Sequence, residues 1–215
     1  MVSREDSNSK RSSVPSVVVG VADHNGWAIL VSAAASNGQP IVVDRRRVPL
    51  VDKGVPSQPY HHETLALPGA EAEELLGKVK RSIAARTALA FERLTSDLSP
   101  RYRVSSIAIR HPPLPQLPAT VADVHQSYYA TCRADGMLYH LALCAEARRR
   151  HWKVQLHQRG EELEKAAEAL QVTTDQVEQF VNGLRLELKP PWTAEHRHAF
   201  AAAIATPGFS WRAKL

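Results

Sequence analysis

The chain has 215 residues, 44% of them hydrophobic, and a formal net charge of +5. That length is sufficient for one well-buried domain. No apolar run approaches the ~20 residues that cross a bilayer, and the polar start of the chain lacks the apolar segment of a secretory signal, so we expect neither a membrane span nor a signal peptide. The positive charge suits a nucleic acid or another polyanion as a partner.

Composition divides the chain into a domain between two tails. Residues 1–15 are charged and Ser-rich without periodicity, which predicts a disordered tail. Residues 16–206 carry the patterned sequence of the domain, and residues 207–215 are expected to form a loosely attached C-terminal tail. Cys132 and Cys144 fall in one predicted helix, ~18 Å apart along its axis, which is too far for a disulfide. We therefore expect a reduced, cytoplasmic setting.

Three apolar runs rich in β-branched residues open the domain. They are separated by Asn25-Gly26 and Asn37-Gly38, and Asn-Gly favours the type I′ turn of a two-residue hairpin because both central residues need positive φ. We expect an antiparallel meander with strands near residues 16–23, 27–35 and 40–51. The first run is apolar almost throughout, which indicates a central strand that is covered on both faces.

Charged residues occur at two places in this meander. Asp23 closes the first strand, either as a functional carboxylate or as the start of the turn, since Asp favours turns. Arg45, Arg46 and Arg47 follow one another in the third strand, and alternation places Arg45 and Arg47 on one face and Arg46 on the other. These arginines either contact phosphates or form a solvated edge that protects the sheet from aggregation.

A loop rich in Pro and Gly follows the meander, at residues 52–69. It contains the run Tyr60-His61-His62-Glu63, and His and Glu are side chains that bind metals. Adjacent residues rarely converge on one ion, so this run predicts a metal site only if a distant element supplies a third ligand.

Helices and two more strands complete the domain. Apolar positions three and four residues apart predict the helices, and Gly136 marks a bend or a close backbone approach in the second. The predicted elements are a helix over 70–98, a strand over 102–110, a helix over 119–150, a strand over 152–157, and helices near 161–170, 174–184 and 193–205. Right-handed crossovers then give an α/β domain with a mixed five-stranded sheet of order 3-2-1-4-5, which is the ribonuclease H-like fold. Actin-like ATPases share this core but need glycine-rich phosphate loops, and the turn at residues 23–27 has one glycine.

Several segments, in order between residues 17 and 205, resemble the RuvC-type Holliday-junction resolvases. They are the first strand with Asp23, RADGM at 133–137, AEA at 145–147, DQVEQFV at 175–181 and EHRHAFAAAI at 195–204. The resemblance implies a Mg²⁺- or Mn²⁺-dependent endonuclease that acts on branched DNA, in which two ions clamp the attacking and leaving oxygens of a phosphodiester. It also implies a homodimer on a two-fold-symmetric junction.

The resemblance assigns positions in a metal site, where Mg²⁺ needs oxygen ligands. The family's first-strand acid falls on Asp23, and its last-helix pair falls on Glu195 and His198, which lie three residues apart and so share one helix face. The family's fourth-strand acid falls on Arg110. A histidine can still bind a metal or act as a base, whereas an arginine cannot bind a cation and would repel it.

Arg110 therefore leaves two hypotheses and one simpler alternative. In the first, the chain is a non-catalytic or weakly active relative that binds nucleic acid, expected to be DNA, or another protein. Arg110 then replaces the charge of the metal, either by pairing with Asp23 or Glu195 or by contacting a phosphate, and Arg45 and Arg47 also contact the partner. In the second, it is a metal-dependent nuclease with a rearranged site. The residues of that site would be Asp23, Glu195, His198 and Glu63. In the simpler alternative, Arg110 and Asp23 form an ion pair that only holds the sheet together. The assignment predicts that Asp23, Arg110, Glu195 and His198 cluster at one end of the sheet, with the side chains of Asp23 and Arg110 within ~8 Å of one another.

Overall fold

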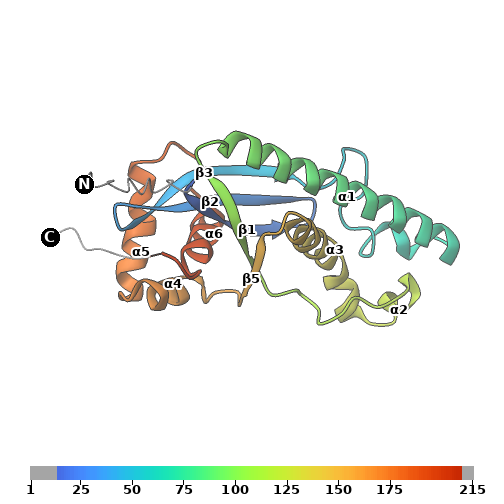
Figure 1. Ribbon diagram of the computed structural model, residues 1–215. Helices are drawn as coiled ribbons and strands as arrows, with labels where there is room; N and C mark the ends of the chain where they lie inside the picture. Colours follow the sequence, from blue (N-terminus) through green and yellow to red (C-terminus); the bar gives the residue numbers. More distant parts are fainter. Residues whose placement is uncertain (1–13, 210–215) are drawn as a thin grey trace, which may run out of the picture.

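The computed structural model describes residues 14–209; the predicted tails lie mostly outside the described residues, at 1–13 and 210–215. The described chain forms a mixed sheet of order β3-β2-β1-β4-β5 (Figure 1). Its strands are β1 (Ser16–His24), β2 (Trp27–Ser36), β3 (Gln39–Pro49), β4 (Arg103–Arg110) and β5 (Lys153–His157). β1 is antiparallel to β2 and parallel to β4. This arrangement confirms the predicted strand order and the ribonuclease H-like fold.

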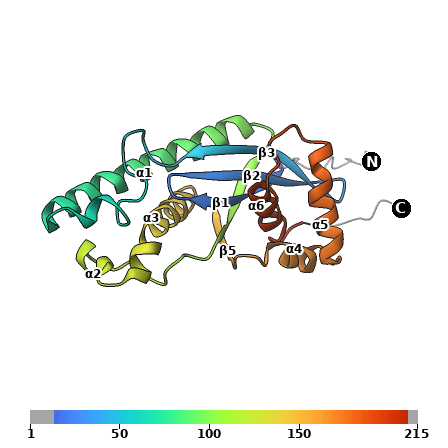
Figure 2. The same cartoon turned by 180° about the vertical axis from the view of Figure 1, so that it is seen from behind.

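Helices cover both faces of the sheet. They are α1 (Gly69–Leu98), α2 (Val121–His125), α3 (Tyr128–Arg149), α4 (Glu162–Leu170), α5 (Thr174–Gly183) and α6 (Ala194–Ile204), with 3₁₀ turns at Glu63–Leu65 and Leu184–Leu186. α1 and α3 lie on one face, and α4, α5 and α6 lie on the other (Figures 1 and 2). β1 contributes to both cores: Val17 and Val19 pack in the α1 and α3 core, whereas Val18 packs in the α6 core. Burial on both faces explains why this strand is apolar from Val17 to Ala22.

The predicted helix over residues 119–150 is wrong in one respect, because two helices occupy this stretch. Ser127 separates them, and its side chain accepts a hydrogen bond from the Ala130 backbone N–H at 3.3 Å, which caps the start of α3. Gly136 does not break α3. A Cβ there would lie 3.4 Å from the side-chain Cγ of Pro113, which is close to an ordinary van der Waals contact, so the glycine marks neither a break nor a close backbone approach.

The two Asn-Gly turns also differ from one another. Asn37 and Gly38 have φ values of 50° and 76°, as a type I′ turn requires. At the first turn only Gly26 has a positive φ, of 95°, so the predicted type I′ conformation is wrong there. The Gly26 carbonyl instead accepts a hydrogen bond from the Leu50 N–H at 2.8 Å, which ties this turn to the segment that follows β3.

One glycine in β1 sets the position of α6. A Cβ at Gly20 would overlap the backbone carbonyl of Ala199, so the α6 backbone can lie directly on β1 only because residue 20 is glycine. This contact brings the first turn of α6 to the end of β1, where Asp23 lies. No helix among residues 14–209 is long and apolar enough to cross a membrane.

Candidate functional site

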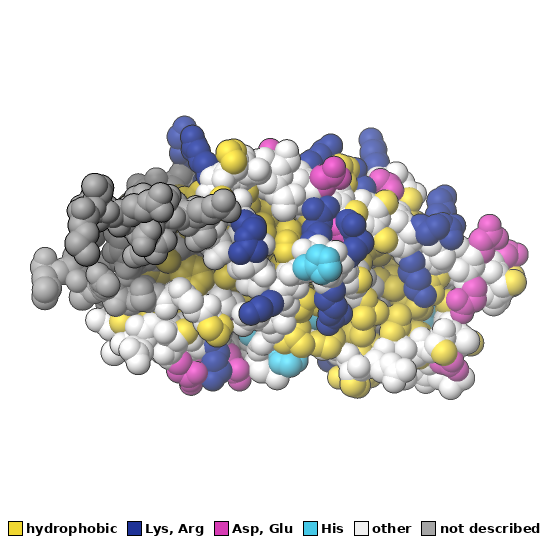
Figure 3. Space-filling model, in the orientation of Figure 1, with side chains coloured by type: hydrophobic (Ala, Val, Ile, Leu, Met, Phe, Trp, Pro, Cys, Tyr) yellow, Lys and Arg dark blue, Asp and Glu magenta, His cyan; other side chains and the backbone are white. Residues whose placement is uncertain are grey.

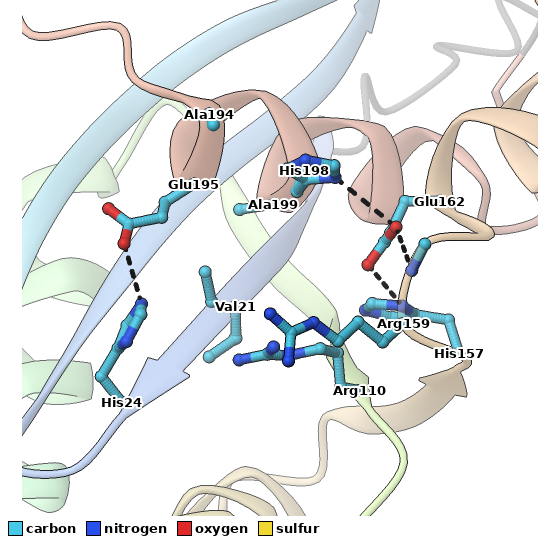
Figure 4. A pocket seen from close by; sticks show the side chains of 12 residues that line it. Val21, His24, Arg110, His157, Arg159, Glu162, Ala194, Glu195, His198 and Ala199 are labelled. Atoms are coloured by element: carbon cyan, nitrogen blue, oxygen red, sulfur yellow. Dashed lines mark hydrogen bonds and ion pairs between the residues drawn. The ribbon is translucent and has the colours of Figure 1, made fainter.

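The predicted site lies where β1 and β4 end, beside the first turn of α6. His24, Arg110, Glu195 and His198 line one cavity of about 320 Å³ (Figure 4). Asp23 lines the neighbouring hollow, which also includes His24 and Arg110. The fold therefore brings Asp23, Arg110 and the pair Glu195 and His198, which come from three distant segments of the sequence, to one end of the sheet.

Arg110 and Asp23 are direct partners. Nη2 of Arg110 donates to the backbone carbonyl of Asp23 at 2.8 Å and to its carboxylate Oδ1 at 3.2 Å. The side chains are only 27% and 14% exposed, respectively, so water screens the pair less than it would a surface ion pair. The guanidinium thus offsets the charge of the carboxylate that the resemblance assigns to a metal.

Glu195 pairs with His24, a residue that the sequence analysis did not single out. Oε1 of Glu195 lies 3.1 Å from Nε2 of His24. The His24 ring stacks on Trp27, with ring centroids 4.0 Å apart and planes inclined by 9°. Burial lowers the pKa of His24, although the nearby Glu195 carboxylate acts in the opposite direction. At neutral pH this imidazole is therefore mainly uncharged.

On the other side of the cavity, Glu162 lies between two histidines. Its side chain is 4% exposed, and its two oxygens lie 3.5 Å from Nδ1 of His157 and 3.5 Å from Nδ1 of His198. The Gly160 backbone N–H also donates to Glu162 at 2.9 Å. Burial lowers the pKa of His157. The buried carboxylate therefore lies within ion-pair distance of His198, whose own side chain is half exposed.

Sequence reasoning missed several residues that line this cavity. They are His24, His157, Arg159 and Glu162. His24 directly follows Asp23 in the chain. The other three follow β5 or end it, and β5 is the parallel neighbour of β4. Since ligand sites in parallel sheets lie beyond the carboxyl ends of the strands, the residues after strand five could have been included.

The donor set does not fit the metal site that the resemblance implies. Among the residues that the structure describes, no three or more His, Cys, Asp or Glu side chains are arranged to hold one ion. Each predicted ligand faces another partner: Asp23 faces Arg110, Glu195 faces His24, and His198 faces Glu162. The predicted ligand set is therefore not assembled in this structure.

The arginines of β3 alternate as predicted. Arg46 faces α1, where its guanidinium lies 2.9 Å from the Asp97 carboxylate. Arg45 faces the opposite side and donates to two backbone carbonyls in the link between α5 and α6. Arg47 lies on the same side, with its guanidinium carbon 4.2 Å from the centre of the Trp27 ring. Arg45 thus holds the link that leads into α6, while Arg47 is exposed.

The loop run at residues 60–63 packs against α3. Asp135, which is 2% exposed, accepts hydrogen bonds from the backbone N–H groups of Tyr60 at 3.0 Å and His61 at 3.2 Å. Burial raises the pKa of Asp135 to about 6. The distant partner of this run is therefore a carboxylate that binds its backbone. Among the described residues, no group of three or more metal-binding side chains includes this run, so the condition for a metal site here is not met.

Solved structures resemble this chain, whereas no protein-family model and no curated protein matches it. The structure of Thermus thermophilus RuvC is 17% identical, with a TM-score of 0.46. The structure of T. thermophilus RuvC in complex with a Holliday junction substrate is also 17% identical, with a TM-score of 0.47. Each alignment covers 88% of this chain and 92% of the other. At this identity the likeness concerns the fold alone.

Proposed function

We propose that this chain is a nucleic-acid-binding domain in which Arg110 takes the place of catalytic metal ions. The observation that carries the proposal is the contact of Arg110 with both the carbonyl and the carboxylate of Asp23. Two unit charges about 4 Å apart interact by about 4 kcal/mol at an effective dielectric constant of about 20, and a divalent ion doubles that energy. A fixed guanidinium therefore opposes a metal at this position, and we expect little or no metal-dependent cleavage.

The charges around the site favour a phosphate-bearing partner. Arg110 and Arg159 both point into the cavity, where an anion between them would relieve their mutual repulsion (Figure 4). Lys and Arg side chains also spread across the middle of the face in Figure 3, with few acidic side chains among them. The partner that we propose is DNA. The homodimer and the cytoplasmic location remain predictions.

The test is to measure binding and cleavage of labelled branched, duplex and single-stranded DNA, in EDTA and in Mn²⁺. We expect binding in EDTA that weakens as salt is added, and intact DNA after incubation with Mn²⁺. Arg110→Ala should weaken binding. Arg103→Ala, which removes an exposed arginine from the opposite end of the same strand, should not.

Two results would contradict the proposal. Cleavage in Mn²⁺ that Asp23→Asn abolishes would favour the alternative function, a metal-dependent endonuclease acting on branched DNA. The absence of binding to all of these DNAs, by a protein with a normal melting profile, would refute nucleic-acid binding.

A further inference from the structure

Three neighbouring hollows, which we call the groove, lie in a row across the ends of β1 and β4. The cavity of Figure 4 shares Glu195 with a hollow of about 320 Å³ beside β3. It shares His24, Arg110 and Arg159 with a hollow of about 330 Å³ beside the link that follows β4. The groove therefore runs from the arginines of β3, past the Arg110–Asp23 pair, to the β4–α2 link.

A stack of planar side chains lines the β3 end of this groove. The His24 ring and the Arg47 guanidinium each lie about 4 Å from the centre of the Trp27 ring, at 4.0 Å and 4.2 Å. The His24 ring and the Arg47 guanidinium cannot both lie over the same face of Trp27 at this distance. Trp27 therefore lies between the two groups. Arg47 is exposed, which leaves its outer side accessible to another planar group. Nucleobases stack on such aromatic and guanidinium surfaces in proteins that bind single strands.

Each carboxylate that lines the groove has a side-chain partner, but Asp23 alone has a guanidinium, while Glu162 lies between His157 and His198. Two of the guanidinium groups have no carboxylate partner. Asp23 faces Arg110, and Glu195 faces His24. Within residues 14–209, neither Arg47 nor Arg159 has a carboxylate at ion-pair distance. Positive charge is therefore available both at the stack and in the cavity, where a chain of phosphates could meet it.

We propose that this groove binds a single strand of nucleic acid, with one backbone phosphate between Arg110 and Arg159 and one base on Arg47. The inference rests on the proposed function and narrows its ligand to unpaired strands. Hollows of about 320 Å³ admit roughly one nucleotide each, and Arg110, 27% exposed, lies in the cavity wall. A flexible strand can enter such a groove and offer a base to Arg47. In a duplex the bases are stacked inside the helix and cannot do so.

The test compares one sequence of about 16 nucleotides as single-stranded DNA, single-stranded RNA, duplex DNA and one arm of a four-way junction, in EDTA. Fluorescence anisotropy should show that a single strand binds at least about tenfold more tightly than the duplex. The duplex is expected to lose one stacking contact and one phosphate contact in the groove, which accounts for a difference of this size. Arg47→Ala and Arg159→Ala should each weaken single-strand binding several-fold. Arg185→Ala, in the Leu184–Leu186 turn outside the groove, should leave it unchanged.

Tryptophan fluorescence gives an independent readout of the stack. Binding of a single strand should change the emission of Trp27, and Trp27→Phe, compared with the wild-type protein when both are saturated with the strand, should remove most of that change. Preference for DNA or RNA identifies the source of the strand, and either one supports the inference.

The outcomes separate this inference from the function on which it rests. If the duplex or the junction bound with the same affinity as the single strand, and Arg159→Ala did not change that affinity, the single-strand groove would be overturned. Nucleic-acid binding itself would still stand. No binding to any of the four ligands would overturn both.

Discussion

Asp23 is partly buried and Asp135 is fully buried, and their surroundings differ in kind. Asp23, at the end of β1, has the Arg110 guanidinium 3.2 Å from its carboxylate, beside an open groove. Asp135, in α3, receives only neutral partners, the backbone N–H groups of Tyr60 and His61, and burial raises its pKa to about 6. The first aspartate belongs to a charged site that a ligand can reach. The second fastens a loop to a helix, so a buried acid by itself does not identify a functional site.

The largest effect should come from Gly20→Ala, which disturbs the Asp23 region and leaves the Asp135 region intact. The added Cβ would overlap the Ala199 carbonyl and push α6 away from β1. We expect the free energy of unfolding to fall by about 3 kcal/mol or more, measured by urea denaturation. Gly183→Ala is the matched control, because nothing lies within 4 Å of its added Cβ. If the free energy of unfolding of Gly20→Ala equalled that of the wild-type protein, the packing of α6 on β1 would be contradicted.

Asp135→Ala should have the next largest effect. It leaves the two buried N–H groups of residues 60 and 61 without an acceptor, so we expect a loss of about 3 kcal/mol in unfolding free energy. Both losses are measured at about pH 4, where Asp135 still carries its proton; there Asp135→Asn, which keeps one acceptor oxygen, should lose about half as much as Asp135→Ala. Equal stability of all three proteins in urea would show that Asp135 does not fasten the loop.

The pH dependence distinguishes Asp135 from an aspartate paired with a cation. Its pKa in the folded protein, about 6, lies above the ordinary value of 3.8, so the folded state holds the proton more tightly. The stability that Asp135 contributes is therefore complete below about pH 4 and is lost as the pH rises through about 6. Relative to Asp135→Asn, the wild-type protein should lose about 3 kcal/mol across this range. Histidines with lowered pKa values affect the stability of both proteins equally, so their contribution cancels in this comparison. If the difference in unfolding free energy between the two proteins stayed constant with pH, the raised pKa of Asp135 would be disproved.

The smallest effect should come from the Asp23–Arg110 pair itself. Both side chains are partly exposed, so a double-mutant cycle with Asp23→Asn and Arg110→Gln should give a coupling energy of about 1 kcal/mol. A coupling energy of several kcal/mol would place the pair among buried structural ion pairs instead. It would then favour the simpler alternative, in which Arg110 only holds the sheet together.

The sequence predicted the sheet because local patterns determined it. Asn-Gly turns fixed the meander, and helical crossovers of one hand placed strand four beside strand one, so Asp23 and Arg110 could be predicted as neighbours. The conformation of the first turn could not be predicted in the same way. It depends on the bond between Leu50 and Gly26, which only the folded chain brings together.

The partners of the site residues were harder to predict than their positions. Glu162 reaches His198 from another helix, and Glu195 meets His24 because α6 rests on β1 at Gly20. Such pairs depend on side-chain directions across elements, which periodicity does not specify. Asp135 lies in the segment RADGM at 133–137, but no local pattern indicated that its side chain would bind the backbone of the loop at residues 60–63.

The most direct test of the central claim, that Arg110 stands where metal ions would bind, is the melting temperature of the wild-type protein as Mg²⁺ or Mn²⁺ is added. A ligand that binds only the folded state at about 100 times its Kd stabilises it by about 2.7 kcal/mol, so a real site would raise the melting temperature by several degrees. We predict no such rise. A rise that depends on metal concentration and disappears in Asp23→Asn would contradict the account.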